Sequence, residues 1–160
     1  MSTDARTDIE EIQRLKYRYG RFLDTKDFAA MTDLMTDDVT VAYGGGAVVL
    51  TGREAVREWL STAMGSPSML SSHVFSHPDI EVEGDTARGS WALQDIVILD
   101  DLALVIRGAS YYDDRYRKVD GRWLIQHTGY KRLYEEIGPR GEGTRTTASW
   151  HGTDGKSSLV

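Results

Sequence analysis

Apolar residues recur every three or four positions through the first 25 residues, which predicts an amphipathic helix. Thr7 and Glu10 have the spacing of a capping box, so the helix is predicted to start near residue 8. Its apolar face carries Ile9, Ile12, Leu15, Tyr19, Phe22 and Leu23. Because a leucine at position 19 would leave no hydroxyl to satisfy, the phenol of Tyr19 on this face needs an explanation, and so does Asp24 five residues later.

Two shorter helical patterns follow the first one. Residues 27–35, "DFAAMTDLM", predict a second helix with Asp27 as its N-cap. Residues 53–64, "REAVREWLSTAM", predict a third helix, and Thr51 and Glu54 have capping-box spacing at its start. Between these helices, "VTVAYGGGAVVL" is rich in β-branched residues and broken by three glycines, which indicates a hairpin.

From residue 70 onward the pattern changes to period two, which predicts strands. Two runs flank the turn Glu83-Gly84-Asp85, and two longer runs flank Asp120-Gly121, a strong hairpin signal. Helices first and a large antiparallel sheet afterwards predict an α+β domain. Long strands twist and curl, so helices on the concave side are expected to leave a pocket.

Composition limits the possible classes of protein. A chain of 160 residues with 40% hydrophobic content is one domain with a substantial core, here residues 1–137, followed by a polar, glycine-rich arm, residues 138–160, expected to be flexible. The net charge of -6 argues against a nucleic-acid partner. The absence of cysteine excludes disulfides and thiolate sites. No apolar run is long enough for a membrane span or a signal peptide, so a cytoplasmic location is expected.

Strand parity places two polar residues among apolar ones. Asp95 shares a face with Trp91, Leu93, Val97 and Leu99, where an unpaired carboxylate would cost several kcal/mol. His73 shares a face with Phe75 and His77 on the preceding strand. We therefore expect His73 to lie beside Asp95, which would satisfy the carboxylate and fix the imidazole tautomer.

Each candidate residue also has a purely structural interpretation. Taken alone, His73 and Asp95 are more often satisfied core residues than catalysts, and the phenol of Tyr19 can bond a carbonyl. Asp24 can end the first helix, and Arg132 can be a solvated charge at a strand edge. The four histidines show no metal-binding spacing, and "YGGGAV" lacks the helix context and the lysine of a phosphate loop, so neither a metal nor a nucleotide site is predicted.

The segments "LKYRYGRFLDTKDF", "SSHVFSHPDIEV", "SWALQDIVI", "GASYYDDRYRKVDGRW" and "TGYKRLYEE" occur in this order along the chain. Together they resemble the SnoaL-like branch of the nuclear transport factor 2-like superfamily, over about residues 9–137. Within that branch they are most similar to the bile acid 7-alpha-dehydratases. The helical Tyr–Asp spacing is common across the superfamily, whereas "TGYxRxYEE" and "YxDxYxKxDGxW" are narrower.

The resemblance implies a fold, an assembly and a set of site residues. It implies a cone-shaped α+β barrel, no cofactor, a small hydrophobic substrate, and a homo-oligomer, a trimer or dimer, built through the open sheet face. The catalytic residues of the dehydratases fall on Tyr19, Asp24, His73 and Asp95, and a substrate-binding arginine falls on Arg132. The segments "VAYGGGAVVLTG", "MGSPSML" and "DDLALVIRG" depart from the family pattern. They line the expected pocket, so they affect the substrate more than the reaction class.

These expectations combine into a hydro-lyase acting on a hydroxylated keto-steroid, bile-acid-like or similar polycyclic substrate. His73, held by Asp95, would act as base or acid, because imidazole titrates near neutrality. Tyr19 would donate to the developing oxyanion, Asp24 would polarise Tyr19 or receive a proton, and Arg132 would hold an anionic or carbonyl group. The fold also serves cyclases, isomerases and epoxide hydrolases, as well as non-catalytic subunits, and these classes remain alternatives.

Overall fold

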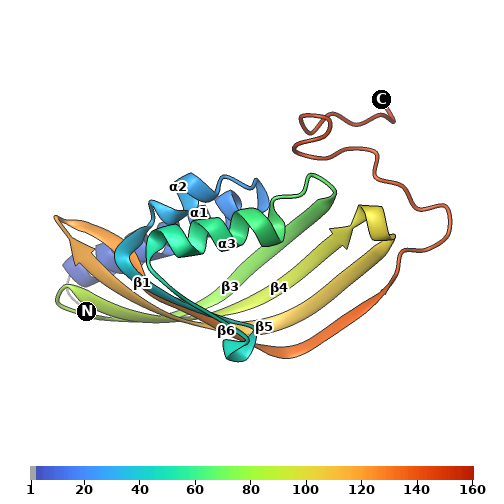
Figure 1. The fold of residues 1–160 in the computed structure, drawn as a ribbon. Helices are drawn as coiled ribbons and strands as arrows, with labels where there is room; N and C mark the ends of the chain where they lie inside the picture. The colour runs from blue at the N-terminus through green and yellow to red at the C-terminus, as the bar shows by residue number, and fades with distance from the viewer. Residues whose placement is uncertain (1–2) are drawn as a thin grey trace.

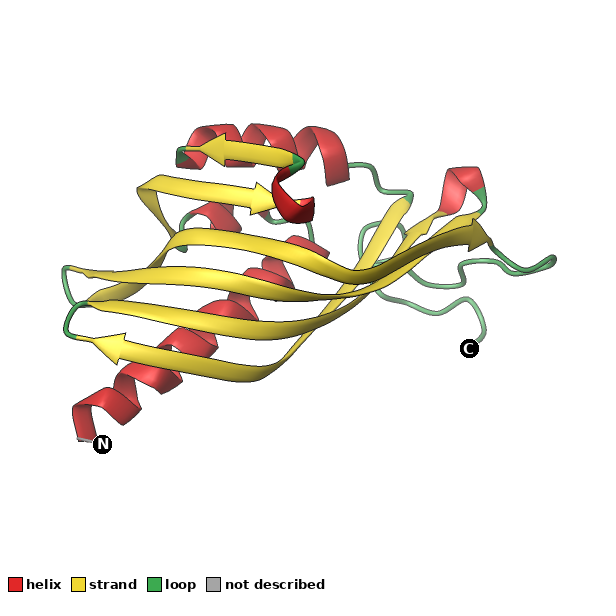
Figure 2. Ribbon diagram, turned by 90° about the horizontal axis from the view of Figure 1, so that it is seen from below, coloured by secondary structure: helices red, strands yellow, loops and turns green. Residues whose placement is uncertain are grey.

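Three helices cover one face of a strongly curved six-stranded sheet, and the other face is left uncovered (Figure 1, Figure 2). The computed structural model describes residues 3–160. The helices are α1 (Thr3–Asp24), α2 (Phe28–Thr32) and α3 (Arg53–Met64), with short 3-10 turns η1 (Gly44–Gly46) and η2 (Asp100–Leu102). The strands are β1 (Met35–Tyr43), β2 (Val48–Thr51), β3 (Met69–Glu83), β4 (Thr86–Leu99), β5 (Leu104–Val119) and β6 (Arg122–Pro139). The predicted α+β class with a curved, mostly antiparallel sheet is confirmed.

The strands lie in the order β2-β1-β6-β5-β4-β3, and every neighbouring pair is antiparallel except β1 and β6. All three predicted hairpins form, between β1 and β2, β3 and β4, and β5 and β6. At the last of these turns Asp120 and Gly121 both have positive φ, 49° and 76°, as a type I′ turn requires. The parallel contact of β1 with β6 joins the N-terminal hairpin to the sheet.

Alternation along β4 separates the covered face of the sheet from the uncovered face. Trp91, Leu93, Asp95 and Val97 are all buried, and the residues between them are more exposed. Trp91 and Leu93 form one core cluster with Tyr112, and the helices contribute Ile12, Leu15, Leu23, Val56 and Leu60 to the neighbouring cluster. Phe75, Ile80 and Tyr130 pack against both clusters, so the buried set of β4 faces the helices. The predicted common face of β4 is therefore the face on which the pocket lies.

The start of the first helix, the end of the second helix and the N-cap of the third helix differ from the predictions. The first helix begins at Thr3, five residues before the predicted start. The second ends at Thr32 because the next residues turn into β1, although Asp27 caps it as predicted through its bond to Ala30. The third helix spans the predicted residues, but its N-cap is Gly52, with no side-chain cap.

The last strand runs two residues beyond the predicted domain boundary, to Pro139. Residues 141–160 form no helix or strand. The backbone nitrogen of Arg140 donates to the carbonyl of Ala103 at 2.7 Å, and the Arg140 side chain pairs with Asp100. The Trp150 side chain in this segment is 65% exposed. Within residues 3–160 no helix has the length and apolar character needed to cross a membrane.

Candidate active site

A cavity of about 70 Å³ lies between the helices and the covered face of the sheet. It is lined by residues of six elements: Tyr19, Leu23, Tyr43, Trp59, Leu60, Met64, His73, Tyr112 and Tyr130. Four of these side chains are phenols and one is an imidazole, set in an otherwise apolar wall. The cavity thus contains two of the predicted site residues, Tyr19 and His73, and three phenols that the sequence reasoning missed.

His73 is oriented by Asp24 and not by Asp95. Its Nδ1 lies 2.6 Å from Oδ1 of Asp24, and its backbone nitrogen donates to Oδ2 of the same carboxylate at 2.9 Å. Ser71 adds a third donor to Asp24 at 2.8 Å. An ionised carboxylate only accepts, so Nδ1 carries the proton and Nε2 is left with its lone pair. The imidazole is about one tenth exposed, which suits a base at the wall of a cavity.

The predicted contact between His73 and Asp95 is wrong, although the two residues are register partners on β3 and β4. Asp95 instead accepts a two-pronged hydrogen bond from Arg132, whose Nη2 lies 3.1 Å from Oδ2 and whose Nη1 reaches Oδ1. Arg132 has a second acidic neighbour in Glu135, with Nε 2.9 Å from Oε2. Asp95 is therefore paired with the guanidinium of Arg132 on β6. The carboxylate that holds the imidazole is that of Asp24.

Gly108 explains how Arg132 reaches Asp95 across an intervening strand. Gly108 is the register partner of Asp95 on β5, between β4 and β6. A Cβ on Gly108 would lie 2.6 Å from Nη1 of Arg132, so only glycine leaves room for the guanidinium above the strand. The guanidinium carbon also lies 5.1 Å from the ring centre of Tyr130. Asp95 and Arg132 thus support the wall behind Tyr130 and do not line the cavity themselves.

Tyr19 and Tyr43 form a hydrogen-bonded pair of phenols, with their oxygens 2.8 Å apart. Burial raises the pKa of Tyr19 well above its ordinary value, and the hydrogen bond from Tyr43 opposes part of that rise. Tyr19 also makes a side-chain hydrogen bond with Tyr112. Three hydroxyls hold three protons, and only two lie between them. Because all three residues line the cavity, the remaining O–H of this set is placed to donate to a bound molecule. The carboxylate of Asp24 accepts from Ser71 and from His73, and its predicted polarisation of Tyr19 stays a prediction.

Lys16 and Asp114 form a fully buried ion pair that the sequence reasoning also missed. The Nζ of Lys16 lies 2.7 Å from Oδ2 of Asp114, and both side chains have no exposed area. A signal for Lys16 exists in the sequence, because it lies four residues after Ile12 and three before Tyr19, on the apolar face. Asp114 alternates with Tyr112 and Tyr116, which identifies its face in the same way.

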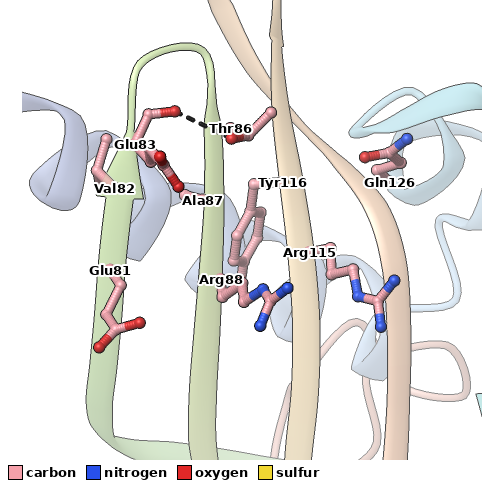
Figure 3. A pocket seen from close by; sticks show the side chains of 9 residues that line it. All are labelled: Glu81, Val82, Glu83, Thr86, Ala87, Arg88, Arg115, Tyr116 and Gln126. Carbon is pink, nitrogen blue, oxygen red and sulfur yellow. Dashed lines mark hydrogen bonds between the residues drawn. The ribbon is translucent and has the colours of Figure 1, made fainter.

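A second hollow, of about 680 Å³, lies at the turn between β3 and β4, far along the sheet from the imidazole (Figure 3). Glu81, Arg88 and Arg115 line it, with Arg88 and Arg115 directly opposite each other on β4 and β5. It contains no imidazole and no carboxylate–imidazole pair. Charges of both signs in open solvent are poor groups for proton transfer, so we place the chemistry in the smaller cavity.

No group of three or more histidine, aspartate or glutamate side chains in residues 3–160 is arranged to hold a metal ion. The acid–base groups that line the cavity are the imidazole of His73 and the phenols around it. Such a set can remove a proton from carbon and stabilise the oxyanion that forms.

Comparison with known proteins agrees with this fold. A family model described as "SnoaL-like domain" matches residues 4–129. A protein from Novosphingobium aromaticivorans assigned by name to the scytalone dehydratases has a TM-score of 0.78 at 21% identity, covering 91% of this chain and 100% of its own. A hexachlorocyclohexane dehydrochlorinase from Novosphingobium barchaimii has a TM-score of 0.76 at 18% identity, covering 91% and 98%. A Mycobacterium tuberculosis protein of unknown function has a TM-score of 0.71 at 26% identity, covering 81% and 73%.

Proposed function

The chain belongs to the SnoaL-like family, and we propose that it is a cofactor-independent lyase that eliminates water from a hydroxylated cyclic ketone. The observation that carries this proposal is the Asp24–His73 pair beside the Tyr19–Tyr43 pair at one cavity. An elimination next to a carbonyl requires a base for the acidic C–H, a donor for the enolate oxygen and an acid for the departing hydroxyl. The cavity supplies each of these groups.

The Nε2 of His73 acts as the base in the proposed reaction. It takes the proton from the carbon next to the carbonyl, and the electrons of the broken C–H bond move onto the carbonyl oxygen as an enolate. Asp24 stabilises the resulting imidazolium through Nδ1 and keeps the ring in one orientation. The enolate then expels the hydroxyl on the neighbouring carbon, which leaves as water with the proton from His73.

Tyr19 acts as the donor to the enolate oxygen in place of its bond to Tyr112, while Tyr43 donates to Tyr19. A hydrogen bond in an enclosed, apolar site is stronger than the same bond in water, because water does not compete for it. Tyr112 and Tyr130 complete the aromatic wall, with ring centres 5.3 Å apart. The flat rings favour a planar, unsaturated substrate and product.

Two structurally similar proteins are named as a dehydratase and a dehydrochlorinase, and both names describe eliminations. This similarity supports elimination as the reaction type. The finer proposal, a hydroxylated keto-steroid of the bile-acid type, follows from the motif resemblance alone. Drug-sized ligands occupy pockets of roughly 300–1,000 Å³, and this cavity has about 70 Å³. A polycyclic substrate therefore requires the α3 side of the wall, Trp59 and Met64, to move outward.

We also propose that the uncovered sheet face contacts further copies of the chain. Val74, Ile96 and Tyr111 lie on this face and are 56%, 44% and 54% exposed. Exposed apolar side chains gathered on one face are typical of protein interfaces. Sedimentation velocity on wild type and on Tyr111→Lys tests this proposal. A dimer or trimer that dissociates in the variant supports it, and a wild-type monomer contradicts it.

The experiment that tests the activity is a panel of hydroxy-ketones, monocyclic to steroidal, incubated with the enzyme in D₂O and followed by mass spectrometry. Loss of one water with a conjugated ketone as product supports the lyase. Deuterium uptake with no change in the number of oxygens indicates an isomerase using the same base. Neither change on any member, with the wild-type fold intact, contradicts catalysis and favours a binding scaffold.

A further inference from the structure

Lys16 has a position that the proposed reaction leaves unexplained. It lies in the middle of α1, fully buried, and burial lowers the pKa of its amine while the nearby Asp114 raises it. Removing an ammonium and a carboxylate from water has a desolvation free energy on the order of several kcal/mol for each ion, even when the two are paired. A leucine or methionine at this position would fill the space without that cost, so the charge itself calls for an explanation.

The ammonium of Lys16 is enclosed by three aromatic rings. Its Nζ lies 3.7 Å from the ring centre of Tyr112, 4.6 Å from that of Tyr19 and 4.7 Å from that of Phe75. Two of these rings, Tyr19 and Tyr112, carry hydroxyls at the cavity wall. A cation against the face of a phenol draws electron density from the ring, which strengthens the phenol as a hydrogen-bond donor.

Asp114 is held in place by its own donors. The Tyr116 hydroxyl donates to Oδ2 of Asp114 at 2.7 Å, and Nε1 of Trp91 donates to the Tyr116 oxygen at 2.9 Å. The carboxylate therefore fixes the ammonium while its remaining contacts lie away from the cavity. Burial raises the pKa of Tyr19 and Tyr112, and the charge of Asp114 raises both further. Without the ammonium of Lys16, Asp114 would therefore disfavour negative charge on these phenols.

We propose that Lys16 is a positioning residue for the phenols: its ammonium, fixed by Asp114, polarises Tyr19 and Tyr112 toward a substrate oxyanion in the cavity. This inference rests on the proposed function for its kinetic consequence. The contact of the ammonium with the rings, and its effect on the phenols, are measurable without a substrate. The titratable groups that face the ammonium are Asp114, Tyr19 and Tyr112.

The kinetic experiment compares three variants with wild type. Lys16→Met leaves Asp114 without a partner, so its fold is at risk, whereas Lys16→Met/Asp114→Asn removes both charges and keeps a group that can accept from Tyr116. Lys118→Met is the matched control, because Lys118 also pairs with an aspartate, Asp8, at 2.5 Å and lies 5.2 Å from an aromatic ring, away from the cavity. We expect kcat of the double variant to fall about tenfold with KM little changed, and the control to keep its rate.

The substrate-free experiment uses NMR of protein labelled at lysine Cε and tyrosine Cζ, with only 5 lysines and 8 tyrosines to assign. We expect a charged Lys16 at pH 7 with ring-shifted Hε signals, and Cζ signals of Tyr19 and Tyr112 that move in the double variant but not in Lys118→Met. A neutral Lys16 in wild type, unmoved Cζ signals, or a folded double variant with wild-type kcat would each overturn the proposal. If wild type converts no hydroxy-ketone, the proposed function fails separately, and the NMR result still decides the role of Lys16.

Discussion

The Nδ1 of His73 lies 2.6 Å from a carboxylate oxygen of Asp24, which joins the last residue of α1 to the middle of β3. The same carboxylate accepts the backbone N–H of His73, so side chain and main chain are fixed by one group. This double attachment gives the imidazole one tautomer and one direction. It also makes Asp24, rather than Asp95, the residue that holds Nε2 in its orientation.

Asp24→Asn should lower kcat by about 10²–10⁴-fold with little loss of stability, because an amide supports the wrong tautomer of His73. The matched variant is Asp95→Asn, which weakens the bond to Arg132. It should cost about 1–3 kcal/mol of unfolding free energy and leave kcat nearly unchanged. Steady-state kinetics and urea unfolding on both proteins separate the two roles. Equal rate losses in the two variants would show that the Asp95–Arg132 pair also takes part in the reaction.

Tyr19→Phe should lower kcat by about 10²–10³-fold, because it removes the proposed oxyanion donor and keeps the ring. Thr32→Val is the comparison, since the Thr32 hydroxyl is also buried and hydrogen-bonded, to the carbonyl of Phe28 at 2.9 Å, but lies outside the cavity. That variant should lose stability, by about 0.5–1.5 kcal/mol, and retain its rate. Thermal melting and kinetics measure both. Intact turnover in Tyr19→Phe, accompanied by a lower melting temperature, would make Tyr19 a core residue only.

Gly108→Ala should displace the Arg132 guanidinium, because the new Cβ would lie 2.6 Å from Nη1 and 3.0 Å from the carbonyl oxygen of Tyr134. Forcing a methyl group into such a space costs about 1–3 kcal/mol. Gly138→Ala is the control, since a Cβ there meets no atom within 4 Å. Chemical denaturation compares the two variants. A Gly108→Ala protein as stable as Gly138→Ala would mean that Arg132 has room to move without loss.

The free energy of unfolding should fall as the pH rises above 10.5. Burial raises the pKa of Tyr19, Tyr43, Tyr112 and Tyr116 well above 10.0, so these phenols keep their protons in the folded state while the unfolded chain loses them. The unfolded state then binds fewer protons, and each phenol contributes a slope of up to about 1.4 kcal/mol per pH unit. Burial lowers the pKa of Lys16, so its contribution to the free energy of unfolding rises with pH, but only below its ordinary pKa of 10.5.

Urea unfolding at several pH values above 10.5 measures this slope in wild type and in Tyr116→Phe. The variant lacks one of the four phenols, so its slope should be smaller. A stability that does not change with pH in this range would contradict the protonated, buried state of the phenols.

Much of the fold could be predicted because it depends on local periodicity and turn chemistry. The two-residue hairpin at Asp120-Gly121 needs positive φ at both positions, which aspartate and glycine tolerate, and the structure has it. The end of the second helix was missed because "MTDLM" has both helical spacing and strand-forming neighbours. The pairing of Met35 with Ile125 on β6, 90 positions later, takes that residue into the sheet. Local sequence contains no information on that partner.

The sequence by itself determined which residues face the space between helices and sheet, because a period of 3.6 or 2 assigns a face to every position. Tyr19, His73 and Asp95 were all placed on that side. The tertiary structure alone decided the partners on that side: Asp24 with His73, Arg132 with Asp95, and Lys16 with Asp114. Each pair joins elements far apart in the chain. The contacts of Asp24 and Lys16 depend on where α1 crosses the sheet, and the contact of Arg132 with Asp95 depends on the missing side chain of Gly108. Periodicity specifies neither.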